Sequence, residues 1–560
     1  MKKLLAIILS ALTLCSVTAC SQESEILTVE QDFTEIDAAK LPAKVDLRYF
    51  GGKNYVTPVK TQWFGDCWAF SLTGAAEISY LYSNDMGVPS GEVNDKVNFS
   101  EKHLTWYLFH GITNDDVVKG KVRASQVGEG FDPSEAESGR EIAAYIIGGP
   151  FIHDANFYGA GFGPVDESVS VKGEYPYAYD DSWTGEWILP LNAEYRNAPV
   201  AALIRSNSRL QSPASFDSDG NYKLNTDGLN AIKYELSQGH GVSIALCSSH
   251  AGFNSKNRAA YYFGNDKPDH AVTVVGYDDD YPKENFTQKN GKGETVEGST
   301  PPENGALIIK NSWGLTSMDE KNTDDGFIYV SYYDHSLLTP SSCVFDGGDS
   351  IRHRAPNYDQ YDLMMTGWYA STEYDGETKM ANIYDAEEDE SLYQIAYSVS
   401  LPKTEVAYEI YKGVDVDNPS SGTLLEKGIY RHNFAGFQKI DLKKEYALKK
   451  GDRYSVVLTM KHMTGEDGTM VYTEVFPYST EFFEGMTVRG VINKGESFLY
   501  TDGKWNDMSE MKDSLTDRAY KQCGEVIAAD RSLPELKLKG KDSVAVDNYP
   551  IKAILAPANS

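Results

Sequence analysis

Cysteine and positive charge are both scarce in this sequence. The chain holds 6 cysteines in 560 residues, too few for a scaffold built on disulfides. Its 52 Lys and Arg face 82 Asp and Glu, so the net charge is −30. This charge argues against a nucleic-acid binder and against electrostatic docking on anionic lipid. Hydrophobic residues are plentiful at 41%, which excludes a mostly disordered chain.

Long hydrophobic runs are absent after the first twenty residues. Lys2 and Lys3 precede an apolar stretch at 4–17, which is too short to span a bilayer comfortably and is typical of an export signal. The small residues before Cys20 resemble the lipobox of bacterial lipoproteins, although a plain secretory signal with a chance cysteine is the alternative. We therefore expect a signal peptide at 1–20 and a lipid anchor on Cys20, outside the cytoplasmic membrane.

The first part of the mature chain mixes helical and strand signals. We interpret residues 21–43 as a linker or short pro-segment, because they are acidic and lack periodicity. After them the sequence predicts a helix at 68–82, a second helix with Ser100 as its N-cap, and buried strands at 270–276 and 306–310.

From residue 346 to residue 560 the sequence pattern changes to short strand-like runs separated by turns with Gly and Asp. This pattern predicts a separate all-β unit, a sandwich, with few helices. The clearest strands are 406–411, 454–460 and 470–476. The length of the whole chain allows about three or four domains.

Three places in the first part carry chemistry. Cys67 opens a helix, where unpaired N–H groups and positive potential favour the thiolate. Gln62 lies on the approach loop, so its amide and the Cys67 N–H form a two-donor oxyanion hole. His270 begins a buried strand as a fixed base, and Asn311 ends the next strand, where it accepts the other imidazole N–H. Trp313 can shield that hydrogen bond from water.

These motifs resemble those of the papain-like cysteine peptidases. The resemblance implies that Cys67 is the nucleophile, His270 the general base, Asn311 the residue that orients it and Gln62 the oxyanion donor. It implies no metal and no organic cofactor. The segments that match in the correct order are 45–48, 56–60, 62, 67–70, 99–104, 163–165, 175–177, 269–272, 311–314 and 326–330.

The resemblance also implies an architecture. We expect an α+β, two-lobed papain-like domain at 44–345, with its cleft between a helical half at about 67–160 and a strand-rich half at about 230–345. Residues 346–560 resemble the lectin-like β domain that follows the peptidase in some bacterial extracellular members. The features that carry this weaker match are Tyr361, Trp368-Tyr369, 381–384, 495–498 and Trp505.

Several departures from the family pattern are visible. The second cysteine that usually precedes the nucleophile is missing, and the spacing from Gln62 to Cys67 is one residue shorter than in papain. The Gly-Gly that lines the cleft is reduced to Ser138-Gly139. The distance from Cys67 to His270 is longer than the roughly 130–150 residues of family members. Residues 21–43 are too short for the usual inhibitory pro-region.

Asp66 stands beside the nucleophile, where the family has a small neutral residue. An acid there stabilises the helix N-terminus but opposes the thiolate, and at an exposed position the two effects nearly cancel. We expect the change of Asp66 to Ser to lower the pKa of Cys67 or to leave it unchanged.

Other residues keep two interpretations each. Cys343 and Cys523 form a disulfide or stay buried free thiols, and Cys247 is unassigned. His240 and His250 are rivals of His270, but we interpret both as surface residues. The acidic runs 278–280 and 324–325 bind calcium or, more simply, form a solvated surface. The aromatic residues of the second unit stack on sugars or form its core.

The leading hypothesis is a secreted or surface-anchored cysteine endopeptidase that forms an acyl-enzyme on Cys67, with a protein or peptide as substrate. The alternative is a cell-surface adhesion or glycan-binding protein in which the peptidase half is a scaffold. In either case the C-terminal unit is a candidate to bind a cell-surface glycan or a wall component. We expect no nucleic-acid partner, and contact with the membrane through the lipid anchor only.

Overall fold

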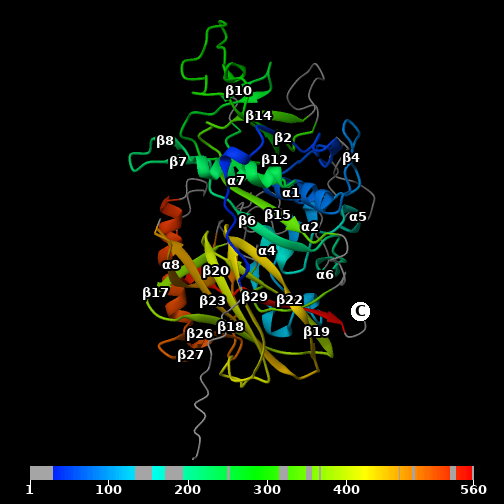
Figure 1. Ribbon diagram of the computed structural model, residues 1–560, viewed down its shortest axis with the longest axis vertical. Helices are drawn as coiled ribbons and strands as arrows, with labels where there is room; N and C mark the ends of the chain where they lie inside the picture. The colour runs from blue at the N-terminus through cyan, green and yellow to red at the C-terminus, as the bar shows by residue number, and fades with distance from the viewer. Residues whose placement is uncertain are drawn as a thin grey trace, which may run out of the picture.

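The computed structural model describes residues 29–132, 154–170, 193–248, 252–314, 326–347, 356–364, 368–465, 467–481, 486–529 and 538–557. Figure 1 shows two parts stacked along the long axis. We call residues 44–345 the N-terminal unit, drawn from blue to green, and residues 356–557 the C-terminal unit, drawn from yellow-green to red. The signal peptide, Cys20, Ser138-Gly139, 175–177, His250 and 324–325 lie outside the described residues.

The N-terminal unit contains the two predicted helices. Helix α1 spans Cys67–Ser83 and is buried along most of its length, which agrees with its Ala- and Leu-rich sequence. Helix α2 spans Glu101–Leu108, and the Ser100 side chain accepts a hydrogen bond from the His103 N–H at 3.1 Å. Both predictions are confirmed. A further helix, α7, spans Thr226–Ser237 and caps its first turn with Asn225.

Most strands of the N-terminal unit belong to one large, mainly antiparallel sheet. Strand β12 (His270–Asp278) pairs with β13 (Ala306–Lys310) on one side and with β9 (Val242–Leu246) on the other. These strands are buried, because their apolar and β-branched runs are covered by helices and neighbouring strands. The predicted strands at 270–276 and 306–310 are therefore confirmed.

The C-terminal unit is rich in strands, as predicted. Its strands β20 (Thr404–Lys412), β23 (Arg453–Thr464) and β24 (Thr469–Thr480) contain the three predicted runs. The prediction of few helices missed α8, which spans Lys512–Ala529. Its buried side chains Leu515, Ala519 and Cys523 recur every four residues, which is a helical signal diluted by the polar residues between them.

Strand pairing joins the two units. The sheet of the N-terminal unit runs through β15 (Leu338–Phe345) and β6 (Ile204–Arg209) into β22 (Gly436–Leu448) of the C-terminal unit. A second link joins β5 (Gly130–Asp132) to β25 (Thr487–Arg489). In both links, a strand of the N-terminal unit pairs directly with a strand of the C-terminal unit that is distant in the sequence.

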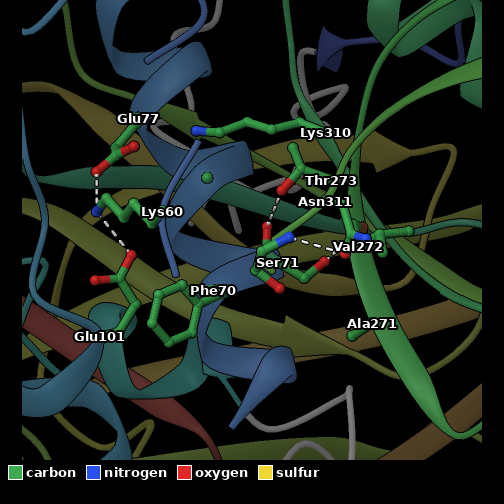
Figure 2. Close-up of a pocket in the computed structure, with 12 residues that line it drawn as sticks. Lys60, Phe70, Ser71, Glu77, Glu101, Ala271, Val272, Thr273, Lys310 and Asn311 are labelled. Atoms are coloured by element: carbon green, nitrogen blue, oxygen red, sulfur yellow. Dashed lines mark hydrogen bonds and ion pairs between the residues drawn. The ribbon is translucent and has the colours of Figure 1, made fainter. Parts of the chain in front are cut away.

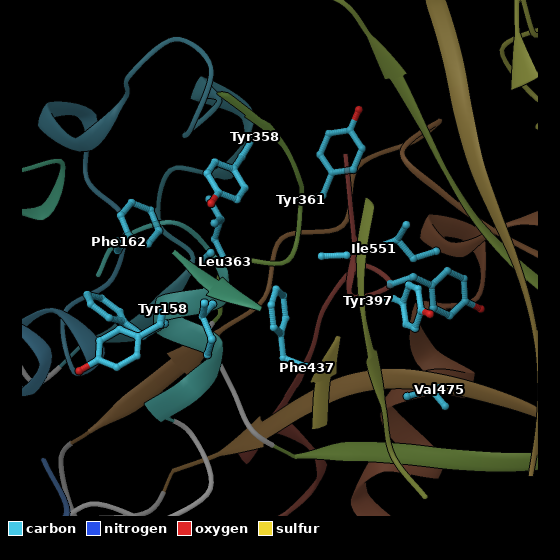
Figure 3. Close-up of a cluster of buried hydrophobic side chains, with 14 of the residues drawn as sticks. Tyr158, Phe162, Tyr358, Tyr361, Leu363, Tyr397, Phe437, Val475 and Ile551 are labelled. Carbon is cyan, nitrogen blue, oxygen red and sulfur yellow. The ribbon is translucent and has the colours of Figure 1, made fainter. Parts of the chain in front are cut away.

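One hydrophobic core also crosses the boundary between the units. Figure 3 shows Tyr158 and Phe162 of the N-terminal unit facing Phe437 and Tyr358 of the C-terminal unit. The packing is close, because a Cβ at Gly159 would lie 2.7 Å from the Phe437 ring. Burial of this shared apolar surface stabilises the association of the units.

Residues 29–46 lie along the outer edges of both units. Strand β1 (Val29–Gln31) pairs in parallel with β21 (Thr423–His432) at an edge of the C-terminal sheet, and Asp32 forms an ion pair with Arg431 at 2.9 Å. The chain then reaches β2 (Lys44–Asp46), which pairs with β12. The described part of the predicted linker therefore connects the two units along their surface. Among the described residues, no helix is both long and apolar enough to cross a bilayer.

Candidate active site

Cys67 is the first residue of helix α1. Residues Ala69 and Phe70 donate their backbone N–H groups to the Asp66 carbonyl, at 2.9 and 3.3 Å, and this turn starts the helix. The first N–H groups of a helix have no acceptor within the helix, so they point toward the space before Cys67. Cys67 is 9% exposed and is therefore nearly buried.

Helix α1 is fixed against strand β12 one turn beyond Cys67. The Ser71 hydroxyl donates to the Val272 carbonyl at 2.6 Å, and the Thr273 hydroxyl donates to the Ser71 carbonyl at 3.0 Å (Figure 2). Gly74 allows this approach, because a Cβ there would lie 2.6 Å from Thr273 Oγ1. The helix start that carries Cys67 is therefore set directly beside the strand start that carries His270.

His270 is held by Asn311, which directly follows the end of β13. Nε2 of His270 lies 2.8 Å from Oδ1 of Asn311, and the same oxygen accepts the Ser312 backbone N–H at 2.8 Å. Because that oxygen accepts both bonds, Nε2 carries the proton and Nδ1 keeps its lone pair in the neutral ring. Trp313 stacks on the imidazole, with ring centroids 4.6 Å apart. This ring covers the hydrogen bond, as expected from the sequence.

The sulfur of Cys67 lies at the strand start. It accepts a hydrogen bond from the backbone N–H of Ala271, the residue after His270, at 3.4 Å. Burial raises the pKa of the Cys67 thiol to about 12, and the Ala271 N–H opposes that rise. Burial also lowers the pKa of His270, while the bond to Asn311 opposes the fall. Attraction between a thiolate and an imidazolium acts against both pKa shifts. The two groups therefore titrate together, and their apparent pKa values belong to the pair and not to either residue.

Gln62 is held in place by the Asn-Ser-Trp-Gly turn. Its backbone N–H donates to the Ser312 carbonyl at 2.7 Å, and the Ser312 hydroxyl donates to Gln62 Oε1 at 2.5 Å. The side-chain amide of Gln62 donates one hydrogen to the Phe64 carbonyl at 2.8 Å. These bonds fix which end of the amide is the donor. Ser312, which holds both Gln62 and Asn311, was not among the residues predicted from the sequence.

Asp66 is buried, which differs from the exposed position considered from the sequence. It is 0% exposed, and neither carboxylate oxygen accepts a hydrogen bond from another described side chain. Burial raises the pKa of Asp66 well above its usual range and so favours the neutral carboxyl group. A neutral acid opposes the Cys67 thiolate much less than a charged one, so its effect on the nucleophile is small.

Behind the site lies a buried cluster of charged side chains. Lys60 contacts Glu77 at 2.8 Å and Glu101 at 2.7 Å (Figure 2). Lys310, next to Asn311, reaches the same group by donating to the Thr57 hydroxyl at 2.8 Å. The cluster connects the approach loop, both helices and β13. Charged residues inside otherwise apolar segments were the signal that could have pointed to it.

His240, the rival of His270, and two residues of the acidic run 278–280 each have a charged or ionisable partner in the structure. His240 is half-buried rather than a surface residue, and its Nδ1 lies 2.8 Å from Glu235. Asp278 and Asp279 form ion pairs with Lys44 and Lys233, both at 2.7 Å. Within the described residues, no cluster of three or more His, Cys, Asp or Glu side chains is arranged to hold a metal ion.

The remaining cysteines and aromatic residues follow the simpler interpretations. Cys343 and Cys523 are buried thiols that form no disulfide with each other, and Cys247 also forms no disulfide within the described residues. In the C-terminal unit, Tyr361 and Trp368 are 5% and 4% exposed and belong to the hydrophobic core. They cannot stack on a sugar. Trp505 is half-buried and donates its indole N–H to Ser420 at 3.1 Å.

Comparison with known proteins agrees with this arrangement. A family model described as a lectin-like domain matches residues 360–520. The fold is similar to that of the clostridial cysteine protease Cwp84 after propeptide cleavage, with 19% identity and a TM-score of 0.58, covering 92% of this chain and 99% of the other. The chain has a papain-like cysteine peptidase fold with a lectin-like domain.

A second Cwp84 structure gives the same result. It contains the cysteine protease and lectin-like domains of this surface-layer-associated protein of Clostridium difficile, at 18% identity and a TM-score of 0.57. The alignment covers 95% of this chain and 91% of that one. The N-terminal unit is therefore called the peptidase unit below, and the C-terminal unit the lectin-like unit. No curated protein sequence matches the chain.

Proposed function

We propose that this protein is an exported cysteine endopeptidase, in which Cys67 attacks peptide bonds. One observation carries the proposal. The Cys67 sulfur contacts the backbone beside His270, and His270 is itself bound to Asn311. Three segments far apart in the sequence thus supply a nucleophile, a base and a residue that orients the base. The fold similarity to a cysteine protease supports the same assignment.

Acylation begins with proton transfer from the Cys67 thiol to Nδ1 of His270. The sulfur then attacks the peptide carbonyl carbon, a C–S bond forms, and the carbonyl oxygen becomes an oxyanion. The Cys67 backbone N–H and the second amide hydrogen of Gln62 donate to that oxyanion. His270 next gives its proton to the leaving amine, the C–N bond breaks, and an acyl-enzyme remains.

Deacylation returns the enzyme to its first state. His270 removes a proton from water, the hydroxide attacks the acyl carbon, and the C–S bond breaks to release a carboxylic acid, while His270 returns its proton to the Cys67 sulfur. Asn311 keeps Nδ1 directed at the reacting atoms throughout, because its bond to Nε2 fixes the ring. Loss of Asn311 therefore impairs both steps. No step in this sequence needs a metal or an organic cofactor.

The peptidase is proposed to act outside the cell. Residues 1–20 serve as a signal peptide, Cys20 carries the lipid, residues 21–43 form a linker, and the units extend over 44–345 and 346–560. The signal-like sequence before Cys20 supports this proposal. Mass spectrometry of the mature N-terminus checks it: a lipidated Cys20 is expected, and an unmodified N-terminus elsewhere contradicts it.

A direct test of the activity uses a peptide library and the full-length protein. We expect cleavage of internal peptide bonds by the wild type and none by the Cys67→Ser or His270→Ala variants. Asn311→Ala is expected to keep a small residual rate, because it removes only the orienting bond. Equal cleavage by wild type and Cys67→Ser would refute the proposal.

The lectin-like match favours a second candidate function, the binding of a surface glycan or wall component. This candidate makes the peptidase unit a scaffold. A glycan array with the Cys67→Ala protein separates the two: retention on defined glycans together with no peptide cleavage by the wild type favours the binder. Cleavage without retention favours the endopeptidase.

A further inference from the structure

Trp63 is an exposed aromatic residue beside the oxyanion donor. Its side chain is 42% exposed, whereas Trp68 of helix α1 is 1% exposed. Tryptophan loses much apolar area from water when it binds a partner, so an exposed one at a reaction centre is a candidate contact for substrate. Trp63 follows Gln62 directly, and only a short segment separates it from Cys67.

Backbone pairing places Trp63 relative to the site. Residues 60–62 run antiparallel to residues 312–314: Gly314 N–H donates to the Lys60 carbonyl at 3.1 Å, Thr61 pairs with Trp313, and Gln62 N–H donates to the Ser312 carbonyl. Opposite residues of such a pair point to the same side. The contact between the Gln62 and Ser312 side chains agrees with this rule. Side chains alternate between the two sides along an extended chain, so Trp63 points to the same side as Thr61. Because Thr61 pairs with Trp313, this is the side of Trp313.

The Trp313 side of this pair is the His270 side. Trp313 stacks on the imidazole at 4.6 Å. His270 must protonate the leaving amine, so the part of the substrate that follows the scissile bond passes beside His270. A ring on this side of the pair is therefore placed to meet the leaving part of the substrate, and not the part that stays on Cys67 as the acyl group.

We propose that Trp63 is a specificity-determining residue, which binds an apolar side chain on the C-terminal side of the scissile bond. This inference rests on the proposed endopeptidase function. It deepens that function by naming the substrate class at one position: peptides with an aromatic or large aliphatic residue after the cleaved bond. A small or charged residue there gains nothing from the indole.

Acyl transfer to added amines tests this binding in isolation. A nitrophenyl ester substrate, which has no amino acid after the scissile bond, forms the acyl-enzyme. An amino acid amide then competes with water: its amine attacks the acyl carbon, His270 takes the amine proton, the C–N bond forms, and the C–S bond breaks. The ratio of aminolysis to hydrolysis reports only the binding of the leaving side.

In the wild type we expect phenylalanine amide to be preferred over glycine amide. Trp63→Ala is expected to lower the ratio for phenylalanine amide by about five- to tenfold, the range typical of one aromatic contact, and to leave glycine amide and ester hydrolysis unchanged. Trp63→Phe should keep most of the preference. Tyr49→Ala, a change at another exposed ring of the peptidase unit (59% exposed), is the matched control and should have no effect.

Three outcomes overturn the inference. A Trp63→Ala enzyme with an unchanged preference shows that the indole does not contact the amine. An equal fall for both amides shows a general disturbance of the oxyanion loop. If the wild type releases nitrophenol no faster than the Cys67→Ser variant, then no acyl-enzyme forms on Cys67, and the endopeptidase function itself fails together with the inference.

Discussion

The molecule contains two buried clusters of ionisable side chains, which differ in their numbers of acids and cations. The first lies behind the candidate active site and contains two cations and two acids, Lys60, Lys310, Glu77 and Glu101. The second lies where the peptidase and lectin-like units meet and contains three acids and one cation, Glu129, Asp362, Asp547 and Lys552. All eight side chains are nearly inaccessible to water.

The first cluster contains as many cations as acids, but its two acids differ. Burial raises the pKa of Glu101, although the charge of Lys60 opposes that rise. Although burial alone would raise the pKa of Glu77, Lys60 and Lys310 hold it below its usual range. Burial lowers the pKa of Lys310 to about 8, so that lysine is still charged at pH 7. Two further acids interact with Glu101: burial raises the pKa of Asp66 well above its usual range and that of Glu167 to about 8. The pair of Lys60 and Glu77 keeps both charges at neutral pH.

The second cluster can persist only with protons bound. Burial raises the pKa of Asp547 to about 8, and it raises the pKa of Glu129 well above its usual range. The two carboxyl groups are hydrogen-bonded to each other, and such a bond needs a proton on one of them. Leu363 also donates its N–H to Glu129. The contact between the units is therefore expected to weaken as the pH rises toward 8, whereas the pair of Lys60 and Glu77 keeps both charges at neutral pH.

The largest effect is expected from breaking the balanced cluster. Glu77→Gln keeps the shape but leaves Lys60 and Lys310 with one buried acid between them. We expect the free energy of unfolding to fall by about 3–5 kcal/mol, the usual result of removing one partner of a buried pair. Chemical denaturation at pH 7 measures it. Glu525→Gln on the exposed face of α8 is the control, and a loss below about 1 kcal/mol at position 77 would contradict this expectation.

The next effect concerns the acid-rich cluster and pH. Asp547 has a pKa of about 8 in the folded protein against an ordinary value of 3.8, so the folded state binds the extra proton between these values. Stability must then fall as pH rises from about 4 to about 8, by about 1.4 kcal/mol per pH unit for one proton.

Glu129→Gln should remove much of that slope. Its amide donates a permanent hydrogen bond to an ionised Asp547 and still accepts the Leu363 N–H. Melting temperatures of wild type and variant between pH 5 and pH 8 test this. We expect the curves to diverge toward pH 8, with the variant more stable. Parallel curves would mean that no proton is shared between the units.

A smaller effect is expected from Ser312, which lies in the candidate active site, in front of the balanced cluster. Ser312→Ala removes the hydroxyl that orients the Gln62 amide but keeps the backbone bond to Asn311. Loss of one such hydrogen bond of about 1 kcal/mol lowers kcat/KM by about five- to tenfold. The unfolding free energy should change little.

The matched control for this change is Ser168→Ala. The exposed Ser168 also donates its hydroxyl to a neighbouring side chain, that of Asp166, but it has no contact with the catalytic residues. The Ser168→Ala variant should leave kcat/KM unchanged. Equal rates for wild type and Ser312→Ala would show that Gln62 needs no support from this hydroxyl.

The smallest effect is expected at Asp66. Because burial favours the neutral carboxyl group, Asp66→Asn should change the pH profile of Cys67 alkylation by less than about 0.3 pH unit. Asp66→Ser should lower the pKa of Cys67 or leave it unchanged, as expected from the sequence. A clear rise in either variant would show that Asp66 assists the thiolate.

The sequence predicts the local elements around the site well. The strand at 306–310 has the bounds of β13, and helix α1 begins one residue before its predicted start. Both follow from local signals, namely a buried β-branched run and an Ala- and Leu-rich helix after a loop. The meeting of Cys67, His270 and Asn311 could be predicted only through the family resemblance, because they are far apart in the sequence.

What the sequence could not show are the long-range relations. The shared sheet depends on β6 meeting β22, and no local pattern encodes that pairing. The burial of Asp66 depends on the tertiary packing around the start of α1, so the raised pKa of its carboxyl group could not be predicted from the local sequence. The two charge clusters likewise combine residues from distant segments.

The most direct test of the central claim is alkylation of the free thiols, followed residue by residue. The full-length protein is treated with iodoacetamide near neutral pH, and Cys67, Cys247, Cys343 and Cys523 are quantified by mass spectrometry. We predict fast, stoichiometric modification of Cys67, which His270→Ala abolishes, while buried Cys343 and Cys523 stay unmodified. Modification of Cys67 no faster than that of Cys343, or unchanged by His270→Ala, would contradict the claim.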